Sequence, residues 1–215
     1  MRGDTLVRVY RTAIGLLAFS ALITEVATLH ERGTLKLANF LSFFTVESNL
    51  LAAVVLVGGG LLLRSGEEGA VAAMLRGAAT LYLTITGLVF SLLLAGLEGV
   101  EFTAVPWDNI VLHYLMPIAI VVDWVLSPPA APIPFRRGLI WLAYPLAYVV
   151  YSLIRGHIVD WYPYPFLDPG PRGYTGVIQS SIGIALTAAV LVYVLTLFTG
   201  PGSLLGRLPR RGNAT

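Results

Sequence analysis

The chain has 215 residues, of which 56% are hydrophobic and 12% charged, and its mean hydropathy is +0.78. A soluble domain is about one-quarter charged, so this composition excludes an ordinary soluble protein and indicates an integral membrane protein. The absence of cysteine excludes disulfides and thiolate chemistry, and the net charge of +2 comes without the basic, aromatic-rich runs that would predict a nucleic-acid partner.

Six apolar stretches follow one another along the chain, and each is long enough to cross a bilayer. The hydrocarbon core is about 30 Å thick and requires roughly 20 apolar residues in a helix. We expect membrane spans at about residues 9–29, 39–63, 76–97, 109–127, 138–156 and 175–199. The first stretch lacks a small-residue cleavage site, so we expect a retained span and not a signal peptide. Because the connectors are short, the sequence predicts an all-α, six-transmembrane-helix bundle that forms a single domain over residues 1–215.

Arginine and lysine are distributed unequally between the two sets of connectors. The amino terminus, the second and fourth connectors and the carboxyl-terminal tail carry ten, whereas the other side carries four: Arg32, Lys36, Arg155 and Arg172. Cytoplasmic segments of membrane proteins are enriched in these residue types. We therefore expect both termini in the cytoplasm and the chain in the plasma membrane.

Polar side chains from five of the predicted helices reach a similar depth beneath the outer interface. At 1.5 Å of rise per residue, Thr45 lies roughly 9 Å along the second helix and His113 about 6 Å along the fourth. The other members of this layer are Glu25, Ser152, Arg155, Gln179 and Ser180. Ionisable groups inside a span are costly and usually face a cavity or a functional site, so this layer is the candidate site.

Helical geometry adds two residues to the layer. Asn49 follows Thr45 by four residues, so the two share one face of the second helix. Pro117 follows His113 by four residues, and its missing N–H leaves the His113 carbonyl without its intrahelical partner and favours a kink. A kink beside a buried imidazole predicts a cavity.

Each of these residues also has a purely structural interpretation. Threonine hydroxyl groups in membrane helices often bond to their own helix, and a histidine near the end of a span often bonds between helices. For Glu47 the structural interpretation is an ion pair with Arg155. We expect Asp123, near the cytoplasmic end of the predicted fourth helix, to snorkel to the interface or to bond with Arg136 or Arg137.

Three segments carry a resemblance to a known family. They are residues 43–49, reading Phe-Phe-Thr-Val-Glu-Ser-Asn, residues 109–117, reading Asn-Ile-Val-Leu-His-Tyr-Leu-Met-Pro, and residues 148–168, which end in Trp-Tyr-Pro-Tyr-Pro-Phe-Leu-Asp. With these segments the chain resembles the androgen-induced protein and androgen-dependent TFPI-regulating protein family of six-span membrane threonine hydrolases. It is similar in particular to the bacterial branch, which implies a bacterial membrane.

The resemblance implies an activity and two catalytic residues. The animal members cleave fatty acid esters of hydroxy fatty acids with a threonine in the second helix and a histidine in the fourth. By position, Thr45 would be the nucleophile and His113 the base. The eukaryotic pattern continues after the threonine with phenylalanine, an aliphatic residue and aspartate, whereas Val46, Glu47 and Ser48 follow Thr45 here.

A threonine hydroxyl is a weak nucleophile and needs an adjacent base, which His113 supplies in this hypothesis. The group that orients His113 is a side chain or a backbone carbonyl, and an oxyanion donor is also needed. The candidates for these supporting positions are Glu47, Asn49, Asn109, Tyr148, Ser152, Arg155, His157 and Gln179. No helix carries two histidines at ligand spacing, so we expect neither a metal nor another cofactor.

Two other functions fit the same residues. A small proton-coupled carrier would use Glu25, Glu47, His113 and Arg155 in one cavity, and a non-enzymatic lipid-binding protein would use the cavity without chemistry. The partner expected for the hydrolase is a membrane lipid or acyl ester, and the sequence predicts no oligomeric state.

Overall fold

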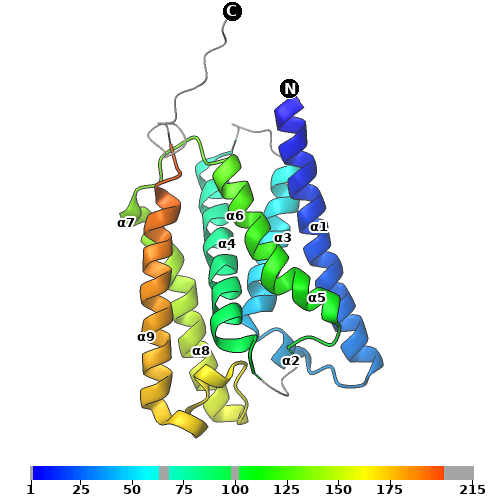
Figure 1. Cartoon of the computed structure of the whole chain (residues 1–215), viewed down its shortest axis with the longest axis vertical. Helices are drawn as coiled ribbons and strands as arrows, with labels where there is room; N and C mark the ends of the chain where they lie inside the picture. The colour runs from blue at the N-terminus through cyan, green and yellow to red at the C-terminus, as the bar shows by residue number, and fades with distance from the viewer. Residues whose placement is uncertain (1, 63–67, 98–101, 201–215) are drawn as a thin grey trace, which may run out of the picture.

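The computed structural model describes residues 2–62, 68–97 and 102–200, and Figure 1 shows their arrangement. Six helices in this part of the chain are long and apolar enough to cross a membrane: Asp4–Glu31, Phe44–Leu62, Ala70–Leu94, Pro106–Leu126, Phe135–Val159 and Pro169–Thr196. The expected all-α architecture with six spans is confirmed, and the described residues form no strand.

The chain runs up and down the bundle through short connectors. In chain order its elements are α1 (Arg2–Glu31), α2 (Leu37–Phe40), α3 (Phe44–Leu62), α4 (Ala70–Val89), η1 (Phe90–Leu94), α5 (Pro106–Ile110), η2 (Val111–Leu115), α6 (Met116–Leu126), α7 (Phe135–Gly138), η3 (Leu139–Leu142), α8 (Ala143–Val159), η4 (Pro165–Leu167) and α9 (Pro169–Thr196). Helix α1 begins and α9 ends at the same end of the bundle, here called the terminal end (Figure 1). Elements α2 and η4 lie at the opposite end, called the site end.

Helix α4 is the centre of the packing. It contacts α3, α6 and α9, and the largest buried share among the six spans belongs to this helix and its continuation η1. Helix α1 packs along α3, while α8 and α9 stand on the other side of the bundle (Figure 1). The small side chains of Ala78 and Ala79 let these neighbours approach α4 closely.

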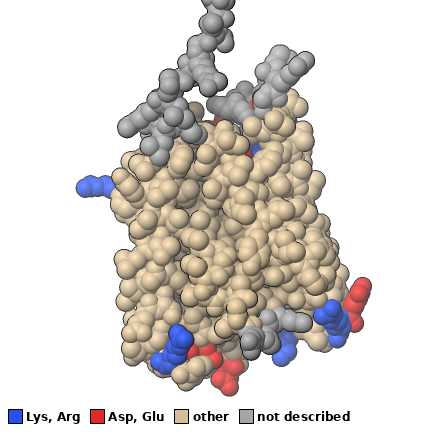
Figure 2. Space-filling view, viewed as in Figure 1, with Lys and Arg blue, Asp and Glu red and all other residues tan. Residues whose placement is uncertain are grey.

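The outer surface of the bundle matches a lipid environment. Aliphatic side chains such as Leu16 on α1, Ile118 on α6 and Val190 on α9 are more than half exposed. Figure 2 shows an uncharged band across the middle of the visible face, with most of the visible charged side chains gathered at its lower edge, the site end. An exposed apolar surface of this extent is stable only where acyl chains cover it.

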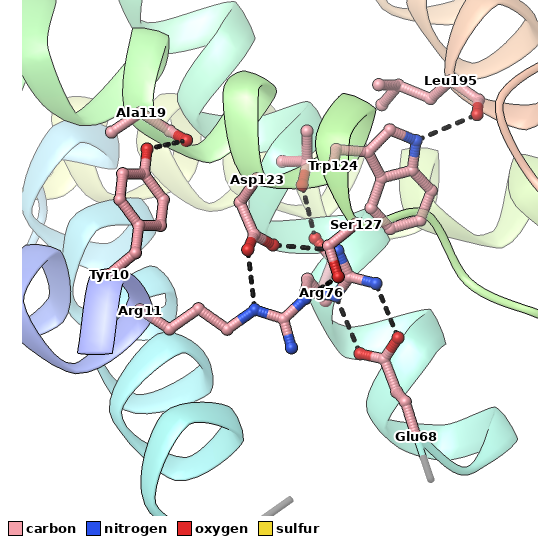
Figure 3. Close-up of polar contacts among 10 residues, drawn as sticks. Tyr10, Arg11, Glu68, Arg76, Ala119, Asp123, Trp124, Ser127 and Leu195 are labelled. Carbon is pink, nitrogen blue, oxygen red and sulfur yellow. Dashed lines mark hydrogen bonds and ion pairs between the residues drawn. The ribbon is translucent and has the colours of Figure 1, made fainter. Parts of the chain in front are cut away.

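Four charged side chains are buried or partly buried together at the terminal end (Figure 3). Arg11 donates to Asp123 Oδ1 at 2.6 Å, and Arg76 donates to Asp123 Oδ2 at 2.9 Å. Arg76 also binds both carboxylate oxygens of Glu68, at 2.7 and 2.6 Å. Two cations therefore neutralise two anions, which lets α1, α4 and α6 carry charges inside the bundle.

The expectation that Asp123 snorkels or pairs with Arg136 or Arg137 is wrong, because its side chain is buried. Both arginines are exposed on α7, whereas Asp123 points into the bundle toward Arg11 and Arg76. The Arg76 pairs explain why α4 begins earlier than the hydropathy pattern predicts. A neutralised arginine does not end a span, so α4 extends past Arg76 to Ala70.

Replacing the shared acceptor tests this network. We expect Asp123→Ala to lower the free energy of unfolding by about 3–5 kcal/mol, since two buried guanidinium groups lose their common carboxylate. Thermal or denaturant unfolding in detergent micelles measures the change. The control is Arg136→Ala at the same end, which we expect to stay within about 0.5 kcal/mol of the parent protein because its side chain is exposed. Equal stability of the two variants would contradict the assignment.

Candidate active site

Thr45 and His113 meet at the site end of the bundle. Thr45 is in the first turn of α3 and His113 is in η2, and the two side chains are 8% and 4% exposed. The distance between Thr45 Oγ1 and His113 Nε2 is 3.3 Å. This distance is at the long end of hydrogen bonding, which is common for a nucleophile and its base before substrate binds.

The hydrogen bond at the other ring nitrogen fixes which nitrogen of His113 carries the proton. His113 Nδ1 lies 3.2 Å from the Asn109 carbonyl oxygen, which can only accept. Nδ1 therefore holds the proton, and Nε2 presents its lone pair to the Thr45 hydroxyl. Among the candidates for the orienting group, this position is filled by a backbone carbonyl.

Two π-helical segments bring the His113 ring into place. His113 lies in η2, and Phe90 begins η1, which continues α4, so each of these two neighbouring rings comes from a widened helical turn. The two rings stack with centroids 3.9 Å apart. Such widened turns are frequent at functional sites, because they turn one side chain out of the regular helical order. The stack covers one face of the imidazole and leaves its two nitrogen atoms available in the ring plane.

Pro117 explains both the widened turn and its anchor. The Met116 N–H bonds to the Val111 carbonyl five residues back, and in this register residue 117 would bond to the Leu112 carbonyl. Pro117 has no N–H, so Asn49 Nδ2 supplies the donor to Leu112 at 3.1 Å. The sequence predicted that the His113 carbonyl would lose its intrahelical partner. The carbonyl that accepts from another helix is instead that of Leu112, one residue earlier.

The same Asn49 amide also fixes Thr45. Its Nδ2 donates to the Thr45 carbonyl at 2.8 Å, one turn earlier on α3. One fully buried side chain therefore holds the backbone of the hydroxyl-bearing residue and the backbone next to His113. Gly87 of α4 packs directly against Pro117, and a Cβ at position 87 would come within 2.9 Å of the proline ring.

Tyr164 is the residue of the site that sequence reasoning missed. Its Oη accepts from the Thr45 N–H at 3.1 Å and lies 3.2 Å from Thr45 Oγ1. The N–H is free because Thr45 is in the first turn of α3, and Pro165 holds Tyr164 in an extended conformation. The sequence carries one usable signal for Tyr164: it stands between Pro163 and Pro165, which restrict its backbone.

A polar cavity of about 330 Å³ lies above Thr45 and His113 at the site end. Its other polar side chains include Glu25, Arg32 and Lys36, from α1 and the segment after it. Both carboxylate oxygens of Glu25 accept from the single Ala104 N–H, at 2.9 and 2.8 Å. This hydrogen bond fixes the loop before α5 at the cavity wall. Of the polar side chains predicted to lie at one depth, Glu25, Thr45 and His113 line this cavity.

A second cavity, of about 280 Å³, lies on the other side of Thr45. Among the described residues that line it, none is charged. Its walls come from α3, α4, η1, α8, η4 and α9, and Thr45 and Tyr164 line both cavities. The candidate nucleophile therefore stands between a polar compartment and an apolar one, here called the polar cavity and the apolar cavity.

Glu47 and Arg155 point away from each other. Glu47 accepts a 2.7 Å hydrogen bond from the Tyr144 hydroxyl, on the face of α3 opposite Thr45. Arg155 donates to Asn39 Oδ1 at 2.7 Å, and its guanidinium lies 5.0 Å from the centroid of the Trp161 ring. The structural interpretation of the two as an ion pair is therefore wrong, and neither lines a cavity with His113.

The remaining supporting candidates lie at varying distances from the contact. Tyr148 lines the apolar cavity and donates to the Ser42 carbonyl at 2.9 Å. Ser152 is buried on α8 but lines neither cavity. His157 and Gln179 are exposed, because they lie on faces of α8 and α9 that turn away from the bundle. No group of three or more potential metal ligands occurs in the described part of the chain.

A comparison with protein-family models, curated proteins and solved structures finds no match to this chain. The geometry of the site therefore carries the functional argument.

The Asn49 brace can be tested without any assay of activity. Asn49→Leu keeps the size of the side chain but removes the donor, which leaves the buried Leu112 carbonyl without it. We expect the free energy of unfolding to fall by about 1–3 kcal/mol. Thermal unfolding in detergent measures this, with Ser20→Ala as the control, since the exposed Ser20 hydroxyl bonds only within its own helix. An unchanged midpoint for Asn49→Leu would show that the brace contributes nothing.

Proposed function

We propose that the protein is a membrane-embedded hydrolase of lipid esters, with Thr45 as nucleophile and His113 as base. The observation that carries the proposal is the 3.3 Å contact of Thr45 Oγ1 with the unprotonated His113 Nε2. The resemblance of the three sequence segments to membrane threonine hydrolases supports it independently. Esters of hydroxy fatty acids are the substrate class that this resemblance favours.

The reaction follows from the hydrogen-bond chain. Thr45 Oγ1 attacks the ester carbonyl carbon while His113 Nε2 takes the hydroxyl proton. The tetrahedral intermediate collapses, the C–O bond to the alcohol breaks, and His113 returns the proton to the departing alkoxide. Water then attacks the acyl-threonine ester, His113 takes a proton from the water, and the carboxylic acid leaves as Thr45 regains its proton. Atoms balance as one ester and one water yielding one acid and one alcohol.

Tyr164 is the candidate oxyanion donor in this scheme. Its Oη accepts from the Thr45 N–H, and because the Thr45 hydroxyl donates to His113, the Tyr164 hydrogen is directed toward Thr45 Oγ1, beside the carbonyl carbon that is attacked. Burial raises the pKa of Tyr164 to about 12, so the phenol keeps its hydrogen throughout the neutral range. A buried donor aimed at developing negative charge contributes more than it would in water.

Two further features belong to the proposal. The excess of basic residues at the terminal end supports placing that end in the cytoplasm, which would open the polar cavity to the outside of a bacterial plasma membrane.

A lipid-binding protein without catalysis is the second candidate, and the apolar cavity favours it. The carrier hypothesis has less support, because Glu47 and Arg155 do not share the polar cavity.

Covalent labelling tests the nucleophile. We expect a fluorophosphonate probe to label the purified protein, Thr45→Val to abolish labelling, and Thr45→Ser to retain it. We expect His113→Ala to slow labelling by about 10²–10⁴-fold, since the hydroxyl loses its base. Intact-protein mass spectrometry measures the adduct, with exposed His157→Ala as the matched histidine control. Labelling that persists in Thr45→Val would contradict the proposal and favour the lipid-binding alternative.

The oxyanion donor has its own test. We expect Tyr164→Phe to lower kcat for a lipid ester by about 10²–10³-fold with little change in KM, because the donor acts mainly in the transition state. Tyr162→Phe, in the same connector but lining neither cavity, is the matched control. Because the pKa is raised, activity should show no loss from Tyr164 ionisation until about pH 11. Parent-like kcat in Tyr164→Phe would exclude this role.

A further inference from the structure

The apolar cavity opens on the outer, lipid-facing surface of the bundle. Leu146 and Val150 of α8 line it, yet they are 54% and 58% exposed on the outer face of the bundle. A residue can both line a cavity and face outward only where the wall is open. Because this face lies within the apolar band, the opening leads into lipid and not into water.

The packing of α8 explains why the opening exists. Helix α9 is held by contacts with α4, α7, η3 and η4, and α8 is held mainly at its two ends, by η3 and η4. Between these ends α8 meets the bundle through aromatic rings, with Phe44 and Tyr148 centroids 5.0 Å apart and Tyr82 and Tyr144 centroids 5.2 Å apart. Large rings on one side and the small side chain of Ala188 on α9 leave space between the helices.

The apolar cavity extends along α9 from the level of Thr45 toward the terminal end. On α9 its lining runs from Ser181 to Ala188, about 10 Å along the helix axis. Ala188 is only 2% exposed and marks the inner part, away from Thr45 toward the terminal end. The opposite part reaches Thr45 and Tyr164, which separate it from the polar cavity.

We propose that the apolar cavity binds the acyl chain of the substrate, and that the chain enters sideways from the membrane between α8 and α9. This inference rests on the proposed hydrolase function of Thr45. A linear acyl chain is the occupant that fits an uncharged lining, a mouth open to lipid and one end beside the nucleophile. With its chain there, an ester has its carbonyl at Thr45 and its alcohol portion in the polar cavity, with Arg32 and Lys36.

The occupant is tested first by photo-crosslinking. A fatty acid ester with a diazirine at the end of its acyl chain is incubated with the full-length Thr45→Val protein in lipid nanodiscs and irradiated, and the adducts are mapped by mass spectrometry. We expect adducts on the inner parts of α4 and α9, around Ile85 and Ala188. Adducts confined to the polar cavity or to outward-facing residues such as Leu186 would overturn the proposal.

Chain-length preference gives the second test. Ala188→Phe fills the inner part of the cavity, so we expect hydrolysis of a hexadecanoyl ester to fall at least about tenfold while that of a butanoyl ester is retained. Ala185→Phe, about one turn earlier on α9 in the same lining, is a second variant in case Ala188→Phe folds poorly. Leu186→Phe is the matched control on the same helix, because it faces lipid outside the cavity.

The outcomes separate the two proposals. If Ala185→Phe and Ala188→Phe hydrolyse both esters as the parent protein does, the chain site is wrong and the hydrolase stands. If the parent protein hydrolyses no ester but crosslinks map to the inner cavity, the chain site stands and the hydrolase is wrong. Loss of long-chain hydrolysis alone, with fluorophosphonate labelling unchanged, supports both.

Discussion

The buried carboxylate of Asp123 is the contact on which the bundle depends. It lies between Arg11 and Arg76 and so joins α6 to α1 and α4 at the terminal end. In a membrane the alternative partner of a guanidinium is lipid, so each of these helices is held to the others by the cost of exposing its charge. Helix α6 continues through η2 to His113, and α1 packs along α3, which carries Thr45. The electrostatic network at one end therefore joins α6, whose preceding segment η2 carries His113, to α1, along which the Thr45-bearing helix α3 packs.

The site end depends on departures from regular helix rather than on charge. Pro117 cannot supply an N–H, η2 widens the helix by one residue per turn, and the Asn49 amide fills the missing donor position at Leu112. The same side chain binds the Thr45 carbonyl, so a defect in one helix becomes a connection to its neighbour. A regular helix would place His113 at a different rotation about the helix axis and would remove the contact of Asn49 with the Leu112 carbonyl. The irregular turn is thus the feature that aligns hydroxyl and imidazole.

Counting helical rise from the sequence was sufficient to place Thr45 and His113 at one depth, because depth depends only on where a span begins and on 1.5 Å per residue. It was not sufficient to identify neighbours around the bundle. Asp123 was expected to bond with nearby Arg136 or Arg137, yet it bonds with Arg11, far away in sequence, since helix rotation and not sequence distance decides which side chains meet. Glu47 lies at a similar depth to Thr45 but on the other face of α3, against Tyr144. Tyr164 could not be assigned either, because a connector residue reaches the site only after both flanking helices are placed.

The position of Thr45 between two unlike cavities bears on the order of events in the proposed reaction. While the acyl chain fills the apolar cavity, that side of the acyl-threonine is closed to water by the chain itself and by Phe90 and Tyr164. The alcohol must leave through the polar cavity, and the water that hydrolyses the acyl-threonine must enter through the same space. Water therefore reaches the intermediate after the alcohol has departed, and it arrives on the side where His113 Nε2 can accept its proton. A site with a single cavity would let water and lipid compete for one entrance, whereas this arrangement separates the route of the chain from the route of the water.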